Sequence, residues 1–263
     1  MGRIEALTSP ANPLLKDVRR AIARGGLTEQ GYMVAETFHL LEEALRSDLD
    51  IKVILAAESV HSAVRDHVRR LEGIRLVIVD DAVFQKLADT ESSQGVITLA
   101  NPPAWNLAQT CRGQTLTVVL DGLQDPGNAG AIVRAAEAFG ATGVLFTKGT
   151  VGPFNPKTLR ASAGSLFRVP FVHGLDAALA RAALQQRRSA IYSAMPHGGT
   201  PAPEVDFQRK CALVVGSEAH GVSEAWRSGS VSVTIPSAGV ESLNAAVAAG
   251  ILLYEAQRQR SRS

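Results

Sequence analysis

The stretch IPSAGVESLNAAVAAGILLYE, residues 235–255, decides how the C-terminal half of the chain folds. Its first part, 236–242, is a loop of small and polar residues, and from Leu243 onward the residues predict a helix. The side chains of Ser242 and Asn244 favour a helix start, because they can accept hydrogen bonds from the unpaired N–H groups of a first turn.

Small side chains dominate this predicted helix, 243–255. Its larger apolar residues recur at helical spacing, which predicts a stripe that faces a core. They are Leu243, Val247, Ile251 and Tyr254. A glycine inside a helix costs about 1 kcal/mol relative to alanine. Gly250 therefore indicates that a second backbone or a ligand packs close to it. The alternative for this stretch alone is an alanine-rich helix on an ordinary core.

Two earlier stretches also place glycines and polar residues directly after apolar runs. They read VVLDGLQDPGNAGAIVRAAEAF, residues 118–139, and LVVGSEAHGVSE, residues 213–224. The first contains N-x-G-x-x-x-R-x-A, made by Asn128, Gly130, Arg134 and Ala136. The second contains V-G-x-E-x-x-G, made by Val215, Gly216, Glu218 and Gly221. The opening stretch supplies I-P…E-S-L-N-x-x-V-A-x-G, made by Ile235, Pro236, Glu241 to Asn244, Val247, Ala248 and Gly250.

In this order, the three motifs resemble those of the SpoU/TrmH branch of the SPOUT methyltransferases. The resemblance covers the C-terminal half of the chain. It implies an α/β domain with a parallel sheet and a deep trefoil knot, S-adenosylmethionine as methyl donor, and RNA ribose 2′-O-methylation. It also implies a homodimer formed through this domain. A chain threaded through a knot needs small side chains, which Ala245 to Gly250 supply.

Strand and helix patterns alternate along the second half, which predicts an open α/β sheet with ligands at the carboxyl ends of its strands. Strands are predicted at 116–120, 144–146, 167–172, 190–194, 212–215 and 231–235. Helices are predicted at 131–139, 156–163 and 177–187, before the terminal helix.

The first half predicts a smaller α/β domain. Its expected strands are 32–35, 51–57, 75–79 and 95–99, and its expected helices are 14–24, 37–46, 60–71 and 82–87. SPANPLLK, VAETFHLLEEAL and SSQGV resemble an L30e-like substrate-binding domain, although Thr37 stands where that family usually has glycine. The Pro102-Pro103 pair then marks a break. We therefore expect a domain at 1–100, a linker at 101–113 and a methyltransferase domain at 114–263.

Composition limits the remaining possibilities. Residues 1–110 hold 12 Lys and Arg against 15 Asp and Glu, and residues 111–263 hold 15 against 10, so neither half is strongly basic. Cys111 and Cys211 lack C-x-x-C spacing and predict neither a disulfide framework nor a metal site. No apolar run resembles a signal peptide or is long enough to cross a bilayer, which predicts a cytoplasmic protein.

The loop 121–130 and the helix after it form the outline of an anion site, because N–H groups at a helix start are unpaired. Arg134, one turn into the helix, can reach back and grip a phosphate with two hydrogen bonds; a plain surface arginine is the alternative. By resemblance the catalytic residues are Arg134, Asn128, Glu218, Ser242 and Asn244. An arginine has a pKa above about 12 and is a poor base, so we expect Arg134 to work together with an RNA phosphate.

By the same resemblance, three loops hold the cofactor, mostly through main-chain groups. Their residues are Ser193, Ala194, Met195, Gly216, Ser217, Glu218, Gly221, Ile235, Pro236, Ser242 and Leu243. RNA contacts are expected from a basic helix and from a second polar stretch. Their residues are Lys16, Arg19, Arg20, Arg24, Asn155, Lys157, Arg160 and Ser162.

Three functions remain as alternatives at this level. The first is 2′-O-methylation of 23S ribosomal RNA, with transfer RNA as the second choice of substrate. The second is an RNA-binding module that has lost catalysis, against which the intact Asn128, Arg134 and Glu218 argue. The third, a nucleotide-dependent oxidoreductase, lacks a G-x-G-x-x-G or Walker A motif.

Overall fold

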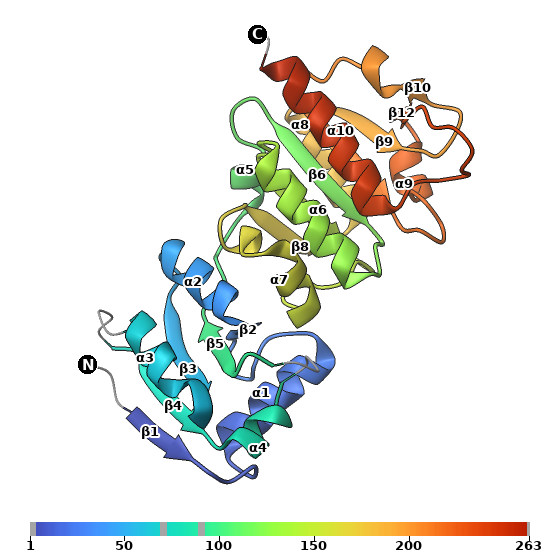
Figure 1. Cartoon of the computed structure of the whole chain (residues 1–263). Coiled ribbons are helices and arrows are strands. Elements are labelled where there is room, and N and C mark those ends of the chain that lie inside the picture. Colours follow the sequence, from blue (N-terminus) through green and yellow to red (C-terminus); the bar gives the residue numbers. More distant parts are fainter. Residues whose placement is uncertain (1–3, 69–72, 89–92, 262–263) are drawn as a thin grey trace. The chain divides into compact units, whose positions relative to one another are not determined.

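A computed structural model describes residues 4–68, 73–88 and 93–261. The chain forms two compact units (Figure 1). Met1–Ala104 and Phe154–Phe167 make the first, and Trp105–Pro153 and Arg168–Ser263 make the second. The segment Phe154–Phe167, which the sequence alone would assign to the second half, thus groups with the first unit.

The first unit is built on a mixed five-stranded sheet. Its order is β1 (Ile4–Leu7), β4 (Arg75–Val79), β3 (Ile51–Ala57), β5 (Val96–Ala100) and β2 (Met33–Glu36). β1, β4 and β3 run parallel, and β5 pairs antiparallel with both β3 and β2. The edge strand β1 has no counterpart among the predicted strands, because half of its residues are exposed and it carries no continuous apolar run.

Four α-helices and one 3-10 turn accompany this sheet in the described part of the first half: α1 (Pro13–Arg24), α2 (Phe38–Arg46), η1 (Glu58–Val60), α3 (His61–Val68) and α4 (Asp81–Gln85). The predicted helix 60–71 extends beyond Val68 into residues outside the described part. Thr37 caps α2, since its hydroxyl oxygen accepts from the N–H of Leu40 at 3.2 Å, and it does so at a φ of 119°. A β-branched residue rarely adopts such a φ, and glycine would fit this position without strain.

The segment Phe154–Phe167 contains α7 (Pro156–Ser162) and η2 (Ser165–Phe167). α7 packs on β2. There Arg160 Nη1 lies 3.3 Å from Glu36 Oε2, and the Glu36 side chain is only 1% exposed. A buried carboxylate without a partner would be strongly destabilising. This ion pair therefore ties α7 to the first unit.

The second unit is built on a seven-stranded sheet in which every pairing is parallel. Its order is β10 (Thr200–Pro201), β12 (Val231–Thr234), β9 (Ala190–Ala194), β11 (Cys211–Gly216), β6 (Leu116–Asp121), β7 (Gly143–Thr147) and β8 (Phe171–Leu175). The predicted strand 167–172 is wrong in its first part, because 165–167 form η2 and the strand begins only at Phe171.

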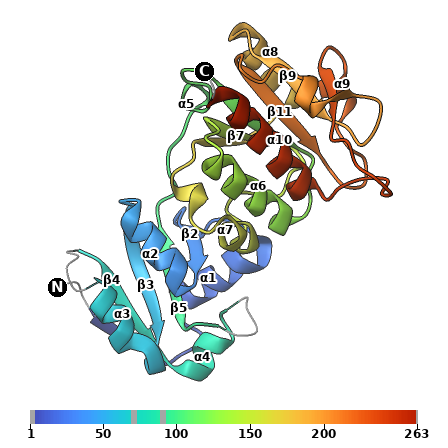
Figure 2. The ribbon, with the colours of Figure 1, turned by 45° about the horizontal axis from the view of Figure 1, so that its top comes forward.

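Helices cover both faces of this sheet. They are α5 (Leu107–Thr110), α6 (Pro126–Ala138), α8 (Ala177–Gln186), α9 (Glu224–Arg227) and α10 (Ala245–Arg260), with the turn η3 (Ala202–Glu204). Figures 1 and 2 show α6 and α10 side by side on one face and α8 and α9 on the other. Val119, Leu184 and Trp226 lie in the core beneath α8 and α9.

The helix α6 begins five residues before the predicted start at Ala131. Pro126 occupies its first turn, and the carboxylate of Asp125 caps it by accepting from the N–H of Asn128 at 2.6 Å. Proline suits the first helical position because it lacks the N–H that would stay unpaired there. Asn128 is therefore part of the helix start and not of the loop.

The face of α10 that packs against the core is not the predicted one. Val247, Ile251 and Tyr254 are 51%, 39% and 55% exposed. The buried residues are Ala245, Ala249, Leu252, Leu253 and Ala256. Alanines let α10 approach α6 closely, so the small face is the one that packs inward within the chain.

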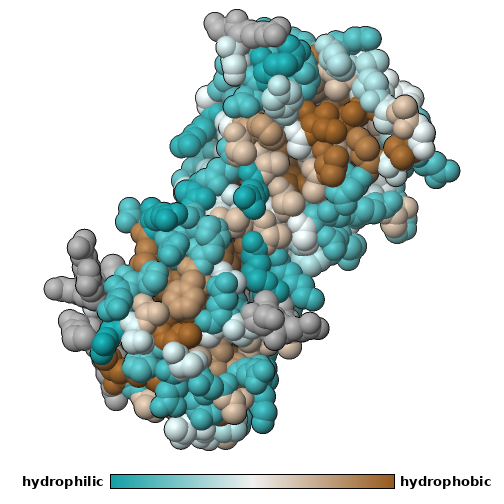
Figure 3. Space-filling model, in the orientation of Figure 1, coloured by the Kyte–Doolittle hydropathy of each residue, from teal (hydrophilic) through white to brown (hydrophobic). Residues whose placement is uncertain are grey.

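An exposed apolar patch results on the second unit. Figure 3 shows hydrophobic side chains gathered over the middle of α10. We call Val247, Ile251 and Tyr254 the α10 patch. A Cβ added at Gly250 would meet nothing within 4 Å, so the described residues do not supply the close neighbour that was predicted at this glycine. The trefoil knot stays a prediction.

Candidate functional site

A cavity of about 780 Å³ opens at the carboxyl ends of β9, β11 and β12 and at the start of α10. The residues after β9 form one wall, the residues after β11 form a second, and 241–245 close the site. This is the place where an open parallel sheet binds its ligands. All the lining residues belong to the second unit.

Nine of the eleven residues expected at the cofactor line this cavity. They are Ala194, Met195, Gly216, Ser217, Glu218, Gly221, Ile235, Ser242 and Leu243. Pro236 is not among the lining residues, and Ser193 is fully buried with its hydroxyl 2.7 Å from that of Ser230. Ser193 therefore joins β9 to the loop before β12 and does not face the cavity.

Further lining residues were not among those expected to hold the cofactor. They include Pro196, His197, Val222, Arg227, Ala248 and Leu252. Most of them directly follow a strand or lie on the inner face of α10. The rule that carboxyl ends of parallel strands meet at one edge could have found the first group.

The loop after β11 folds tightly on itself. The N–H of Gly221 donates to the carbonyl of Ser217 at 2.8 Å, and the N–H of His220 donates to the Ser217 hydroxyl at 3.1 Å. A Cβ at Gly216 would collide with the backbone of Gly221 and Val222. Gly216 is thus required by the close approach of its own loop.

Three polar side chains, one from each motif, are joined at the mouth of the cavity. The amide nitrogen of Asn128 donates to Glu218 Oε1, and its amide oxygen accepts from Asn244 Nδ2 at 3.0 Å. We call Glu218, Asn128 and Asn244 the polar chain. It links the loop after β11 with the starts of α6 and α10.

Asn244 also fixes the start of α10. Its Oδ1 accepts from the N–H groups of Ala246 and Val247 at 2.9 and 3.2 Å. The amide therefore uses its oxygen for the helix and its nitrogen for Asn128. The starts of two helices, α6 and α10, adjoin the carboxylate of Glu218, and the positive ends of helix dipoles stabilise a negative charge there.

Arg134 and Ser242 do not belong to the polar chain. Both are exposed, and neither forms a hydrogen bond or ion pair within the described residues. Six positions separate Asn128 from Arg134, which places them roughly 120° apart around α6 and about 9 Å apart along its axis. The guanidinium of Arg134 is therefore available to an anion outside the chain.

Asp121 was not expected at the site, yet it supports it. This buried carboxylate at the end of β6 accepts from the N–H of Ser223 at 2.7 Å and from the Thr147 hydroxyl at 3.2 Å. It holds together the ends of β6 and β7 and the loop after β11. An Asp-Gly pair directly after a buried strand was the signal for it.

The basic helix α1 presents its cations to solvent. Lys16, Arg19, Arg20 and Arg24 are all exposed. Arg20 pairs with Glu29 at 2.8 Å, and Arg24 donates to the carbonyl of Leu27 at 2.6 Å. Binding a phosphate would cost these side chains at most an exposed ion pair or hydrogen bond, which contributes little to stability.

The second stretch expected to contact RNA, at the start of and within α7, is less exposed to solvent. Asn155 caps α7 by accepting from the N–H of Lys157 at 2.9 Å, and Lys157 is exposed. Arg160 is held by the buried Glu36. Ser162 is fully buried, and its hydroxyl donates to the carbonyl of Leu159 at 2.8 Å. The structure therefore gives Arg160 and Ser162 structural roles.

Within residues 4–68, 73–88 and 93–261, no group of three or more His, Cys, Asp or Glu side chains is placed to hold a metal ion. Among the same described residues, no helix is both long and apolar enough to span a membrane.

The two halves match two family models. Residues 115–254 match the SpoU rRNA Methylase family, and residues 12–98 match the MRM3-like substrate binding domain. The second match lies in the first unit.

Similar proteins extend over almost the whole chain. An uncharacterized tRNA/rRNA methyltransferase of Synechocystis sp. is 34% identical, over 98% of this chain and 95% of its own length. The 23S rRNA (guanosine(2553)-2′-O)-methyltransferase RlmP of Bacillus subtilis is 32% identical, over 95% and 98%. The crystal structure of the SpoU methyltransferase AviRb from Streptomyces viridochromogenes with AdoMet has a TM-score of 0.84 and 27% identity, over 96% of this chain and 100% of that one. The chain belongs to the SpoU rRNA methylase family.

Proposed function

We propose that this protein is an S-adenosylmethionine-dependent methyltransferase that modifies a ribose 2′-oxygen of 23S ribosomal RNA. The polar chain carries the proposal, because it brings one residue from each family motif to the mouth of a single cavity. RlmP of Bacillus subtilis bears the name of a 23S rRNA 2′-O-methyltransferase, and AviRb was crystallised with AdoMet.

The cavity fits S-adenosylmethionine in size and chemistry. Its volume of about 780 Å³ lies within the roughly 300–1,000 Å³ of small-molecule sites. Met195, Ile235, Leu243 and Leu252 line it with apolar surface. The tight 216–221 loop adds main-chain groups that can recognise an adenine. When bound, the cofactor supplies a methyl group already activated by its sulfonium charge.

The residues of this chain position the RNA against that methyl group. Asn128 orients the Glu218 carboxylate and thereby gives the site a fixed hydrogen-bond acceptor near the cavity. Arg134 has a guanidinium open to an RNA phosphate, which it can grip with two parallel hydrogen bonds. Alignment of the ribose hydroxyl with the methyl group is the main catalytic contribution that such a site can make.

We further propose that two copies associate through the α10 patch. Val247, Ile251 and Tyr254 are too exposed to contribute to the core of one chain, and the open space at Gly250 allows another backbone to approach. Arg134 lies on the exposed side of the neighbouring helix α6. A partner on this patch would therefore border the RNA side of the site. Action on ribosomal RNA assigns the protein to the cytoplasm.

The first unit is proposed to choose the RNA, through Lys16, Arg19, Arg20 and Arg24 on α1. Phosphate contacts from these side chains position an RNA without specifying its sequence. The second unit contains the cavity and the polar chain and performs the transfer.

The test is methyl transfer from labelled S-adenosylmethionine to 23S rRNA, with transfer RNA as a parallel substrate. A label on a ribose 2′-oxygen of 23S rRNA supports the proposal. A label on transfer RNA alone would change the substrate, and a methyl group on a base would overturn the reaction. Cofactor binding with no transfer to either RNA would indicate an inactive RNA-binding module.

A further inference from the structure

Basic residues gather at the edge of the seven-stranded sheet opposite the cavity. Parallel strands all begin at one edge, so the segments before β6, β9 and β11 meet there. Cys211 pairs with Leu116 on one side and with Ala190 on the other, which places these three starts next to each other. We define the basic edge by its cations. They are Arg112, Arg187, Arg188, Arg209 and Lys210.

Backbone hydrogen bonds hold the segments of the basic edge together. The N–H of Ala190 donates to the carbonyl of Lys210 at 2.9 Å, and the N–H of Cys211 donates to that of Thr115 at 3.0 Å. Both bonds join strands of the sheet. The edge is therefore part of the rigid sheet and not a set of independent loops.

Arg260, at the end of α10, binds the backbone of the same edge. Its guanidinium donates to the carbonyls of Phe207 at 2.8 Å and of Gln114, Thr115 and Arg209 at 2.9 Å each. Carbonyl partners leave its positive charge uncompensated. Figure 1 shows the end of α10 beside the start of β6. Arg260 thus adds to the charge of the basic edge while it fixes the backbone.

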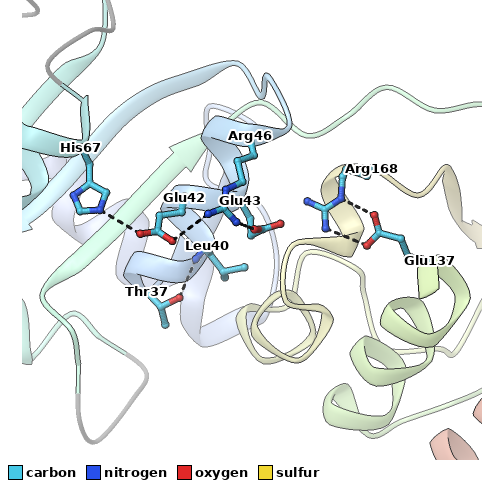
Figure 4. A network of polar contacts seen from close by, with 8 residues as sticks. All are labelled: Thr37, Leu40, Glu42, Glu43, Arg46, His67, Glu137 and Arg168. Atoms are coloured by element: carbon cyan, nitrogen blue, oxygen red, sulfur yellow. Dashed lines mark hydrogen bonds and ion pairs between the residues drawn. The ribbon is translucent and has the colours of Figure 1, made fainter.

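The nearby carboxylates are mostly engaged elsewhere. Glu137, at the end of α6, pairs with Arg168 at 2.5 and 3.0 Å (Figure 4). Glu255 pairs with Arg258 at 2.7 and 2.8 Å. Asp206 remains near Tyr192 and Arg209. Asp206 offsets part of the charge of Arg209, whereas Glu137 and Glu255 do not neutralise the other cations of this edge.

The side chains themselves are accessible. Arg112, Arg188 and Lys210 are exposed and form no ion pair within the described residues. Arg187 donates to the carbonyl of Ala183 in its own helix at 3.2 Å. Tyr192, the aromatic side chain next to Arg209, is only 4% exposed. Such a surface fits a phosphate backbone better than unpaired bases, which proteins recognise by stacking on aromatic rings.

Arg188 occupies a backbone position that favours glycine. It follows the last turn of α8 with a φ of 56°, in the left-handed region. Its N–H donates to the carbonyl of Gln185 at 2.9 Å, and the next N–H donates to that of Leu184 at 3.1 Å. Glycine is the favoured residue at such a helix end. An arginine there costs stability, which a contact of its side chain can offset.

We propose that the basic edge is a second RNA-binding surface, which holds the phosphate backbone of the substrate far from the reacting ribose. The inference rests on the proposed function, because it takes the polyanion to be the RNA that is methylated. A six-residue strand spans roughly 20 Å, and charges are screened over about 8 Å at physiological ionic strength. The edge therefore contributes to RNA affinity and not to the chemical step.

The experiment uses the full chain with the triple variant Arg112→Gln, Arg188→Gln and Lys210→Gln. Its matched control is Arg65→Gln with Lys86→Gln, two exposed cations of the first unit that have no place in the proposed machinery. RNA binding is measured without cofactor, over a range of salt concentrations, on a 23S rRNA fragment. Each lost phosphate contact lowers the slope of log K against log salt by about 0.7 to 0.9.

We expect the triple variant to lose about two units of this slope, to raise the KM for RNA about tenfold or more, and to leave kcat at saturating RNA and cofactor affinity unchanged. The control should keep the wild-type slope. Arg188→Gly should unfold at a higher temperature than the wild type and still bind RNA more weakly, which a merely structural arginine would not do.

An unchanged salt slope and KM in the triple variant would overturn the proposal. So would a variant that binds naked RNA normally but fails on ribosomal particles, since the edge would then bind a protein. Binding is read without methyl transfer, so an inactive wild type that binds RNA would refute the proposed function and leave the edge testable.

Discussion

Asn244 donates from Nδ2 to Oδ1 of Asn128 at 3.0 Å, although 116 positions separate the two residues in the chain. The same Asn244 caps α10 through its oxygen. One amide thus has a structural function and a function at the site, and substitutions can separate the two.

Asn244→Asp should keep the cap, because a carboxylate accepts from N–H groups and is favoured at a helix start. It cannot donate to Asn128. We expect stability within about 0.5 kcal/mol of the wild type and methyl transfer lowered about tenfold or more, the effect of about 1.4 kcal/mol. Asn244→Ala should in addition lose about 1 kcal/mol of stability and bind cofactor more weakly. Thermal unfolding and methyl-transfer rates check both variants, and full activity in Asn244→Asp would contradict the role given to this contact.

Arg134→Ala should abolish methyl transfer while cofactor binding survives, because Arg134 is not among the residues that line the cavity. Arg134→Lys should restore only part of the activity, since an ammonium cannot grip a phosphate with two parallel hydrogen bonds. Calorimetry with S-adenosylmethionine and a transfer assay distinguish the two functions. Equal loss of binding and activity would show instead that Arg134 supports the cavity.

Ile251→Glu should convert the proposed dimer to a monomer, because it places a charge in the α10 patch. Leu179→Glu is the matched control, since Leu179 is 69% exposed on α8, on the other face of the sheet. Light scattering at micromolar concentration gives the mass of each. A wild type that is monomeric and fully active would refute the proposed dimer.

Thr37→Gly should stabilise the first unit. The φ of 119° at Thr37 costs roughly 1–3 kcal/mol in a residue with a Cβ, while glycine loses only a few tenths of a kcal/mol as a helix cap. We expect a net gain of about 1 kcal/mol. Thr37→Ala keeps the strained backbone and loses the cap, so it should be less stable than the wild type. Urea unfolding measures the difference, and the opposite order of the two variants would contradict the strain.

Burial raises the pKa of the Cys211 thiol to about 11, against the opposing effect of the nearby Arg260. The native protein should therefore react with Ellman's reagent at pH 8 only as fast as it unfolds. The free energy of unfolding should also decrease between about pH 9 and pH 11, because only the unfolded thiol loses its proton there. Cys211→Ser removes this decrease. The Cys111→Ser variant retains Cys211 alone. Rapid labelling of this variant in its folded state at pH 8 would show that Cys211 is accessible and contradict the prediction.

The site could be predicted further than the packing around it. Glu218 comes two residues after β11, and Asn128 lies in the first turn of the helix that follows β6. The carboxyl ends of parallel strands meet, so the proximity of these two residues followed from local patterns. The orientation of α10 did not. An apolar stripe on a helix indicates a surface that packs against other apolar groups. It does not reveal whether these groups belong to the same chain, as Val247, Ile251 and Tyr254 illustrate.

The role of Gly216 shows a second limit. The V-G-x-E-x-x-G motif contains this glycine without giving the reason for it, and the atoms that exclude a side chain belong to Gly221 and Val222. Only the three-dimensional path of the loop distinguishes a close backbone from a close ligand. The RNA contacts predicted for Arg160 and Ser162 meet the same limit, because a polar residue on a helix does not reveal whether a buried carboxylate such as Glu36 lies opposite.

The position of Phe154–Phe167 affects how such proteins can be recombined. The segment carries Arg160, the partner of the buried Glu36, and a Cβ at Gly25 or Gly164 would collide with the side chains of Asn155 and Glu43. A chimera that exchanges only residues 1–104 with a relative would therefore join a foreign surface to a native α7 and remove Glu36, the carboxylate that pairs with Arg160. The unit that can be transplanted is discontinuous in the gene. Its exchange needs two crossovers inside the methylase half as well as one at the domain boundary.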